Sequence, residues 1–80
     1  LANQSWMASI QHKNRRIASS ERLGRPGTDD VNYTGVHSIS KKDFEKLRKQ
    51  VRKFLVEVDE TVRPSSEETV CVLCLDLFEL

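Results

Sequence analysis

The sequence predicts a small α+β domain with the order helix, strand, helix, strand, in which a long amphipathic helix packs on a short sheet. Residues 41–62 have helical periodicity, and residues 69–78 form an apolar run rich in β-branched residues. The 80-residue length allows one domain at most. We therefore expect a single domain over residues 1–80, with an N-terminal helix over 1–23 and a strand–helix–strand core over 28–80.

The N-terminal segment has apolar residues at helical spacing, namely Trp6, Ile10 and Ile17. Its amphipathicity is modest. Gly24 and the Pro26 that follows it are typical of a C-cap glycine and a helix breaker, so this helix should end before residue 24.

The first predicted strand spans about residues 31–39, where side chains alternate between two faces. One face holds Val31, Tyr33, Gly35, His37 and Ile39. A glycine inside a strand indicates a bulge or a close backbone approach, so we expect one of these at residue 35.

The strongest element is the helix over 41–62, whose apolar residues fall on one stripe. The stripe consists of Phe44, Leu47, Val51, Phe54, Leu55, Val58 and Val62. Ser40 stands three residues before Asp43, as in a capping box. Because Pro64 cannot continue a helix, the end is expected near residues 61–63.

The second predicted strand, residues 69–78, is apolar enough to be buried on both faces. The core is expected to hold Leu73, Leu75 and Leu77 on one face and Val70, Val72 and Cys74 on the other. A connecting helix favours parallel strands with a right-handed crossover. Since two strands make a poor sheet, a second copy or missing sequence should complete it.

Composition excludes several classes of protein. The chain has 13 Lys+Arg against 12 Asp+Glu, a net charge of +1, which argues against a globally basic nucleic-acid binder. No apolar run approaches the roughly 18 residues of a membrane span, and residues 1–10 lack the apolar core of a signal peptide. We expect a soluble, cytoplasmic chain. Its start at Leu1 rather than Met suggests a fragment of a larger protein, a processed product or a trimmed chain.

No catalytic, cofactor-binding or metal-ligating residue is assigned from the sequence. Cys71 and Cys74 form a C-x-x-C motif, but in an extended strand their side chains point to opposite faces, so we expect buried structural cysteines. His12 and His37 have no acidic or serine partner at a spacing that favours catalysis. The sequence therefore predicts that the chain is not an enzyme.

A ridge of like charge runs along the 41–62 helix opposite its apolar stripe. It consists of Lys42, Lys46, Lys49 and Lys53. Such a ridge is either a solvated helix face or, together with Arg15 and Arg16, a nucleic-acid-binding surface. The helix also has an unfavourable charge order, because lysines lie at its positive end and acidic residues near its negative end.

Several strings follow one another in a fixed order along the chain. They are residues 11–14 (Gln-His-Lys-Asn), residues 29–36 (Asp-Asp-Val-Asn-Tyr-Thr-Gly-Val), a Ser-Ile-Ser turn into residues 41–44, and the closing residues 70–80. In this order they resemble the C-terminal domain of a bacterial family of helix-turn-helix transcriptional regulators, a domain of uncharacterised function. The resemblance covers most of residues 10–80 and implies that DNA is contacted through a missing N-terminal domain.

The leading hypothesis is a non-enzymatic regulatory or dimerisation module, the C-terminal part of a bacterial transcription regulator. The expected partners are a second copy, through the sheet edge or the Trp6 helix, or the rest of the parent regulator. The alternative is a small nucleic-acid-binding domain that uses the basic face of the 41–62 helix. No membrane partner is expected.

Overall fold

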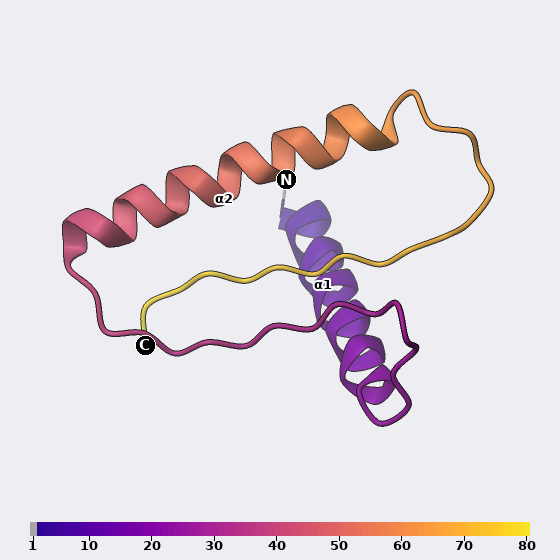
Figure 1. Cartoon of the computed structure of the whole chain (residues 1–80), viewed down its shortest axis with the longest axis horizontal. Coiled ribbons are helices and arrows are strands. Elements are labelled where there is room, and N and C mark those ends of the chain that lie inside the picture. Colours follow the sequence, from indigo (N-terminus) through magenta and orange to yellow (C-terminus); the bar gives the residue numbers. More distant parts are fainter. Residues whose placement is uncertain (1) are drawn as a thin grey trace. The chain divides into compact units, whose positions relative to one another are not determined.

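A computed structural model describes the backbone of residues 2–80 and the side chains of residues 7–80. It contains two helices, α1 (Ala2–Arg22) and α2 (Lys41–Val62), and the remaining described chain is turn or extended coil (Figure 1). The chain divides into two units. Unit 1 combines Leu1–Asn32 with Cys71–Leu80, and unit 2 is Tyr33–Val70.

The predicted α+β fold is wrong, because the described residues contain no strand and therefore no sheet. Residues 31–39 and 69–78 have no regular secondary structure. No backbone hydrogen bond joins either segment to another part of the described chain. A strand exists only when a neighbouring strand pairs with its N–H and C=O groups, and the sequence pattern carries no information on whether that neighbour is present.

The prediction for α2 is confirmed at both ends. Ser40 is the N-cap, with extended backbone angles of φ −71° and ψ 157°, and its Oγ accepts the Asp43 N–H at 3.0 Å. The helix ends at Val62. Arg63 closes the last turn by donating its N–H to the Asp59 carbonyl at 3.0 Å, and Pro64 follows outside the helix.

The N-terminal helix is also confirmed, and α1 ends at Arg22. The C-cap glycine is not, since no glycine of the described chain has a positive φ. The chain leaves α1 through tighter bonds instead, from the Gly24 N–H to the Glu21 carbonyl at 3.1 Å and from the Arg25 N–H to the Arg22 carbonyl at 2.9 Å. The side chain of Trp6 lies outside the described side chains.

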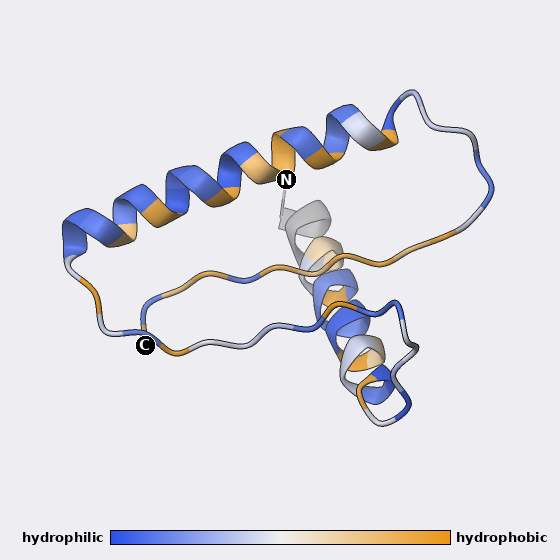
Figure 2. Cartoon of the chain, in the orientation of Figure 1, coloured by the Kyte–Doolittle hydropathy of each residue, from blue (hydrophilic) through white to orange (hydrophobic). Residues whose placement is uncertain are grey.

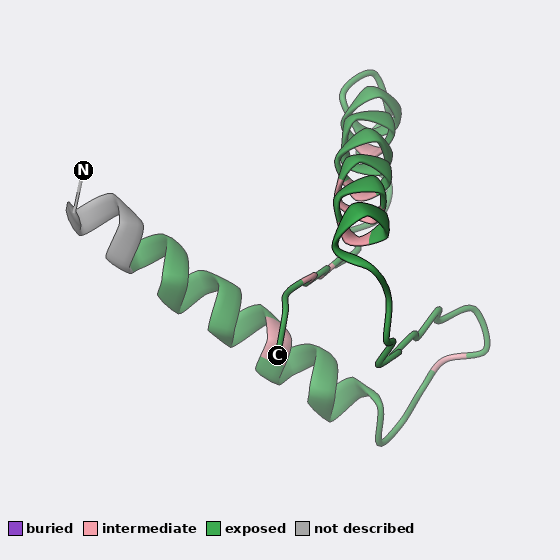
Figure 3. Cartoon of the chain, turned by 90° about the vertical axis from the view of Figure 1, so that its left-hand side faces the viewer, coloured by how far each residue is buried: buried purple, intermediate pink, exposed green. Residues whose placement is uncertain are grey.

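No described residue is fully buried, so the expected core is absent (Figure 3). Val70 is 95% exposed and Leu73 is 55% exposed. Of the six expected core residues, only Cys74 and Leu77 are half-buried. A helix with one apolar stripe buries it against a second layer, and without the sheet that layer is missing. The packing of the 41–62 helix on a sheet, predicted from its stripe, is accordingly wrong.

Candidate functional site

The apolar stripe of α2 is an organised surface of unit 2. This α2 stripe is Phe44, Leu47, Val51, Phe54, Leu55, Val58 and Val62, and Figure 2 shows apolar positions recurring along the helix. Phe54 is 45% exposed, Leu55 44% and Val62 60%. A helical stripe of this kind is ordinarily covered in a folded protein. Here those three residues are exposed and the other four, Phe44, Leu47, Val51 and Val58, are half-buried.

The amino-terminal part of the stripe is covered in part by a neighbouring cation. The Arg48 guanidinium carbon lies 5.4 Å from the centre of the Phe44 ring. Its Nη2 also lies 3.2 Å from Glu45 Oε1, so the same side chain forms an ion pair one turn away. Arg48 therefore screens the Phe44 end of the α2 stripe, whereas the Phe54 and Val62 end has no such cover among the described side chains.

The predicted basic ridge is present on α2, and its members are Lys42, Lys46, Lys49 and Lys53. All four side chains are exposed. Within the described part of the chain none of them forms an ion pair, because Glu45 pairs with Arg48 instead. The ridge is thus a continuous row of accessible ammonium groups on one helix.

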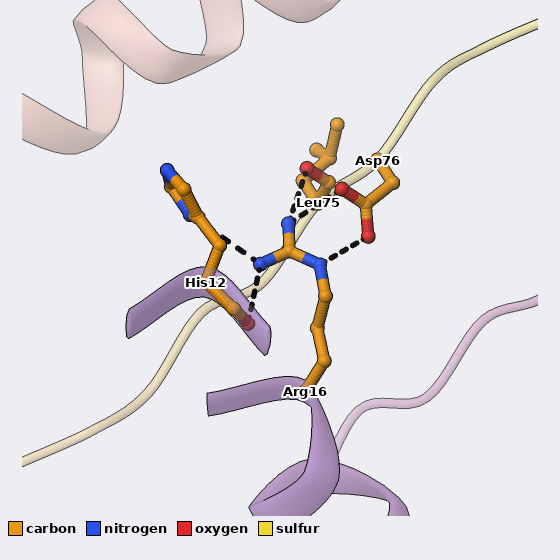
Figure 4. A network of polar contacts seen from close by, with 4 residues as sticks. All are labelled: His12, Arg16, Leu75 and Asp76. Atoms are coloured by element: carbon orange, nitrogen blue, oxygen red, sulfur yellow. Dashed lines mark hydrogen bonds and ion pairs between the residues drawn. The ribbon is translucent and has the colours of Figure 1, made fainter. Parts of the chain in front are cut away.

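The two arginines predicted to extend this ridge lie on α1, in unit 1, and they differ from each other. Arg15 is exposed. Arg16 is half-buried and is the centre of a polar cluster (Figure 4). Its Nε donates to Asp76 Oδ2, and its Nη2 donates to Asp76 Oδ1 at 2.6 Å and to the Leu75 carbonyl at 3.2 Å. Its Nη1 donates to the His12 carbonyl at 3.1 Å.

The contact between Arg16 and Asp76 shifts the pKa of both side chains. The hydrogen bonds from Arg16, followed by its positive charge, lower the pKa of Asp76. The same hydrogen bonds raise the pKa of Arg16. All three nitrogens of the guanidinium donate to protein acceptors. Arg16 therefore ties the C-terminal segment to α1 and is a poor candidate for a phosphate contact.

Sequence reasoning missed the Arg16–Asp76 contact, since the two residues are 60 positions apart. One signal was available. Asp76 is the one charged residue in the apolar run 69–78. A carboxylate inside such a run is costly unless a cation or hydrogen-bond donors meet it, so its position could have indicated a partner.

A second arginine–aspartate contact closes the turn after α1. Arg22 Nε donates to Asp30 Oδ2 at 2.8 Å, and the Gly27 N–H donates to the same oxygen at 2.8 Å. These two bonds, the Arg22 bond first, lower the pKa of Asp30. A Cβ at Gly27 would lie 2.8 Å from Arg22 Nη2 and 3.1 Å from Asp30 Oδ1. A side chain at residue 27 would therefore displace the Arg22 guanidinium from its position beside Asp30.

The histidines and cysteines occupy ordinary surroundings. Tyr33 Oη and His37 Nε2 lie 2.7 Å apart, and a Cβ at Gly35 would clash with both atoms. The bulge or close backbone approach predicted at residue 35 is not found, because residues 31–39 form no strand and only side chains approach this glycine. Cys71 is exposed and Cys74 half-buried, and both are free thiols. The prediction that they are buried is wrong, because the strand that was to bury them does not form.

No group of three or more His, Cys, Asp or Glu side chains in the described part of the chain is placed to hold a metal ion. Neither helix combines the length and the apolar character that crossing a bilayer requires, as far as the described residues go. Comparison with known proteins gave no matching family model, no matching curated protein and no matching solved structure.

Proposed function

We propose that this chain is a non-enzymatic regulatory or dimerisation module of a bacterial, cytoplasmic transcription regulator. One observation carries the proposal. No apolar side chain is buried in the described part of the chain, and the α2 stripe, a continuous apolar face, is left accessible. An exposed apolar face of this kind is typical of a surface that associates with another protein.

A second copy is the partner that explains this surface most simply. An isolated helix of about 20 residues is marginally stable in water, because most helix stability in proteins comes from packing of the apolar face. Homo-oligomers are the commonest assemblies of soluble proteins, and the two-fold dimer is the commonest of these. The resemblance to the C-terminal domains of helix-turn-helix regulators supports the same assignment, with DNA read by another domain of the parent protein.

The proposal is tested by measuring mass and helicity as a function of concentration. Sedimentation equilibrium at chain concentrations from micromolar to millimolar should give an average mass that rises toward the mass of a dimer. The helical signal in far-ultraviolet circular dichroism should rise over the same range, since association stabilises α2. A chain that stays a well-folded monomer at the highest concentration contradicts the proposal.

A second candidate function is nucleic-acid binding through the lysine ridge. It is favoured by one observation, the absence of ion-pair partners for Lys42, Lys46, Lys49 and Lys53 among the described side chains. Fluorescence anisotropy with a mixed-sequence duplex at low and moderate salt tests it. Four neutralised phosphates would give a log–log salt slope of about −3.6. Absence of binding at low salt, or an affinity unchanged when all four lysines are replaced by glutamate, contradicts this second function.

A further inference from the structure

We infer that the α2 stripe is covered by α2 of a second copy lying antiparallel to it. This inference rests on the proposed dimerisation and names the surface and the orientation. It begins from the distribution of charge along the helix. Residues 41–53 carry seven basic and two acidic side chains, a net charge of +5, whereas residues 54–62 carry three acidic side chains and no basic one.

The basic part and the acidic part select the antiparallel orientation. Two parallel copies would place the +5 segment beside an identical segment along its whole length. An antiparallel pair centred between residues 52 and 53 places residues 43–51 of each copy, net charge +1, beside residues 54–62 of the other, net charge −3. Each acidic segment then lies beside a basic segment instead of beside its own copy. The helix dipoles are also opposed in this orientation, which is favourable.

This orientation also accounts for the unfavourable charge order within one helix. Lys41 and Lys42 lie at the positive end of the α2 dipole, and Glu57, Asp59 and Glu60 lie in the last turns near the negative end. Intrahelical electrostatics would favour the reverse order. In an antiparallel pair the acidic turns lie beside the positive end of the neighbouring helix, and the lysines lie beside its negative end.

The apolar spacing provides a matching contact register. Five stripe residues at positions 44, 47, 51, 54 and 58, followed by Thr61, are spaced at alternating intervals of three and four residues, the pattern of a coiled-coil seam. A two-fold axis between Arg52 and Lys53 brings every seam position opposite another seam position of the second copy. Leu47 then faces Val58 of the second copy, and Val51 faces Phe54 of the second copy.

A cross-linking experiment on the full chain tests the orientation. In a background with Cys71→Ser and Cys74→Ser, Leu47→Cys and Val58→Cys chains are mixed, one of them tagged, and oxidised under mild conditions. The inference expects a mixed disulfide between the two chains as the main product. In a parallel pair these positions lie about 16 Å apart along the axis, and disulfides would join two Leu47→Cys chains instead.

A charge-exchange experiment tests the same register without touching the apolar residues. Lys46 and Glu57 are exposed on α2, and the antiparallel register brings Lys46 within reach of Glu57 of the second copy on the same flank. Lys46→Glu and Glu57→Lys should each weaken dimerisation roughly fivefold, and the double variant should restore it. Lys46 is the member of the ridge nearest the seam, whereas Lys49 lies farthest around the helix from it. Lys49→Glu, the matched control, makes the same charge change and should weaken dimerisation less.

Each outcome separates this inference from the function on which it rests. A mixed disulfide together with rescue by the double variant supports the antiparallel pair. A dimer that forms disulfides only between identical positions overturns the inference but leaves the dimerisation module intact. A dimer that gives neither cross-link and is unchanged by the Lys46 and Glu57 exchange also overturns it, since another surface must then associate. A monomer at all concentrations overturns both.

Discussion

Residues 40–64 and residues 69–80 are both rich in apolar side chains, yet one forms a helix and the other forms no regular structure. The difference lies in where each backbone finds hydrogen-bond partners. In α2 every partner is four residues away, and the Ser40 hydroxyl supplies an acceptor for one of the first N–H groups. Between residues 69 and 80 no backbone-to-backbone hydrogen bond forms within the described chain.

An apolar pattern therefore predicts structure reliably only when the backbone hydrogen bonds of that structure join residues close together in the sequence. A helix satisfies its backbone from its own residues, so periodicity and a cap are sufficient information. The backbone hydrogen-bond partners of a strand lie in another segment of the chain, and a single run of apolar residues does not specify that segment. The C-terminal segment instead uses a side chain, because the Leu75 carbonyl accepts a hydrogen bond from Arg16 Nη2 at 3.2 Å.

The largest expected effect is that of a proline within α2, because this helix depends on its own backbone hydrogen bonds. Val51→Pro removes one hydrogen bond from the middle of α2 and clashes with the preceding turn, at a cost of about 3 kcal/mol or more. Most of the α2 signal in circular dichroism should be lost, and with it the concentration-dependent mass.

Val70→Pro is the matched control, since Val70 is 95% exposed and its segment makes no ladder hydrogen bonds in the described chain. It should leave helicity and association unchanged within error. If Val70→Pro damaged the protein as severely as Val51→Pro, residues 69–80 would be paired in solution and the contrast between the two regions would fail.

Removal of the N-cap should have a smaller effect confined to α2. Ser40→Ala deletes the acceptor of the Asp43 N–H, which costs about 1 kcal/mol of helix stability. We expect faster amide exchange over the first turns of α2. Ser38→Ala is the control, because it changes the same residue type just before the cap, where the serine side chain makes no hydrogen bond in the described chain. In this variant the α2 amides should exchange at the unaltered rate. Equal exchange in the two variants would mean that the hydroxyl contributes nothing.

Much of the local structure was predictable from sequence, and the arrangement of the chain was not. Ser40, Pro64 and the seven-residue stripe were sufficient to place α2, because each acts within a few residues of its own position. The predicted C-cap at Gly24 was wrong, since bonds to carbonyls three residues back close that turn. The strands and the core were wrong because both required a second layer that the pattern alone does not supply.

The candidate site divides in the same way. The four lysines of the ridge were identified correctly as an accessible row, since helical spacing alone puts them on one face. Arg16 was assigned to the same surface, but its guanidinium is held by Asp76. The assignment failed because two side chains distant in sequence determine that contact. Only the isolated charge at residue 76 pointed to it.

The smallest expected effect concerns the Arg16–Asp76 contact, which tethers residues 71–80 to α1, and its dependence on pH. Hydrogen bonds from Arg16 lower the pKa of Asp76, so the carboxylate form is favoured when the tether is made. The stabilisation that the Arg16–Asp76 contact gives is fully present above the ordinary aspartate pKa, which is about 3.9. It is lost as the pH falls through the lowered pKa of Asp76. Amide signals of residues 71–80 followed by nuclear magnetic resonance should therefore be constant from neutral pH to about 5 and shift below about 4.

Asp76→Asn should release the same signals at neutral pH, because the neutral amide no longer forms an ion pair with the guanidinium. Asp30→Asn is the matched control, since it removes the corresponding contact with Arg22 and should perturb residues 22–30 while leaving residues 71–80 as they were. Neither carboxylate is buried, because the Asp76 side chain is 53% exposed and the Asp30 side chain 26%. The changes should therefore be local and overall helicity should be preserved. Identical behaviour of residues 71–80 with aspartate and with asparagine at position 76 would show that Arg16 does not hold this segment in solution.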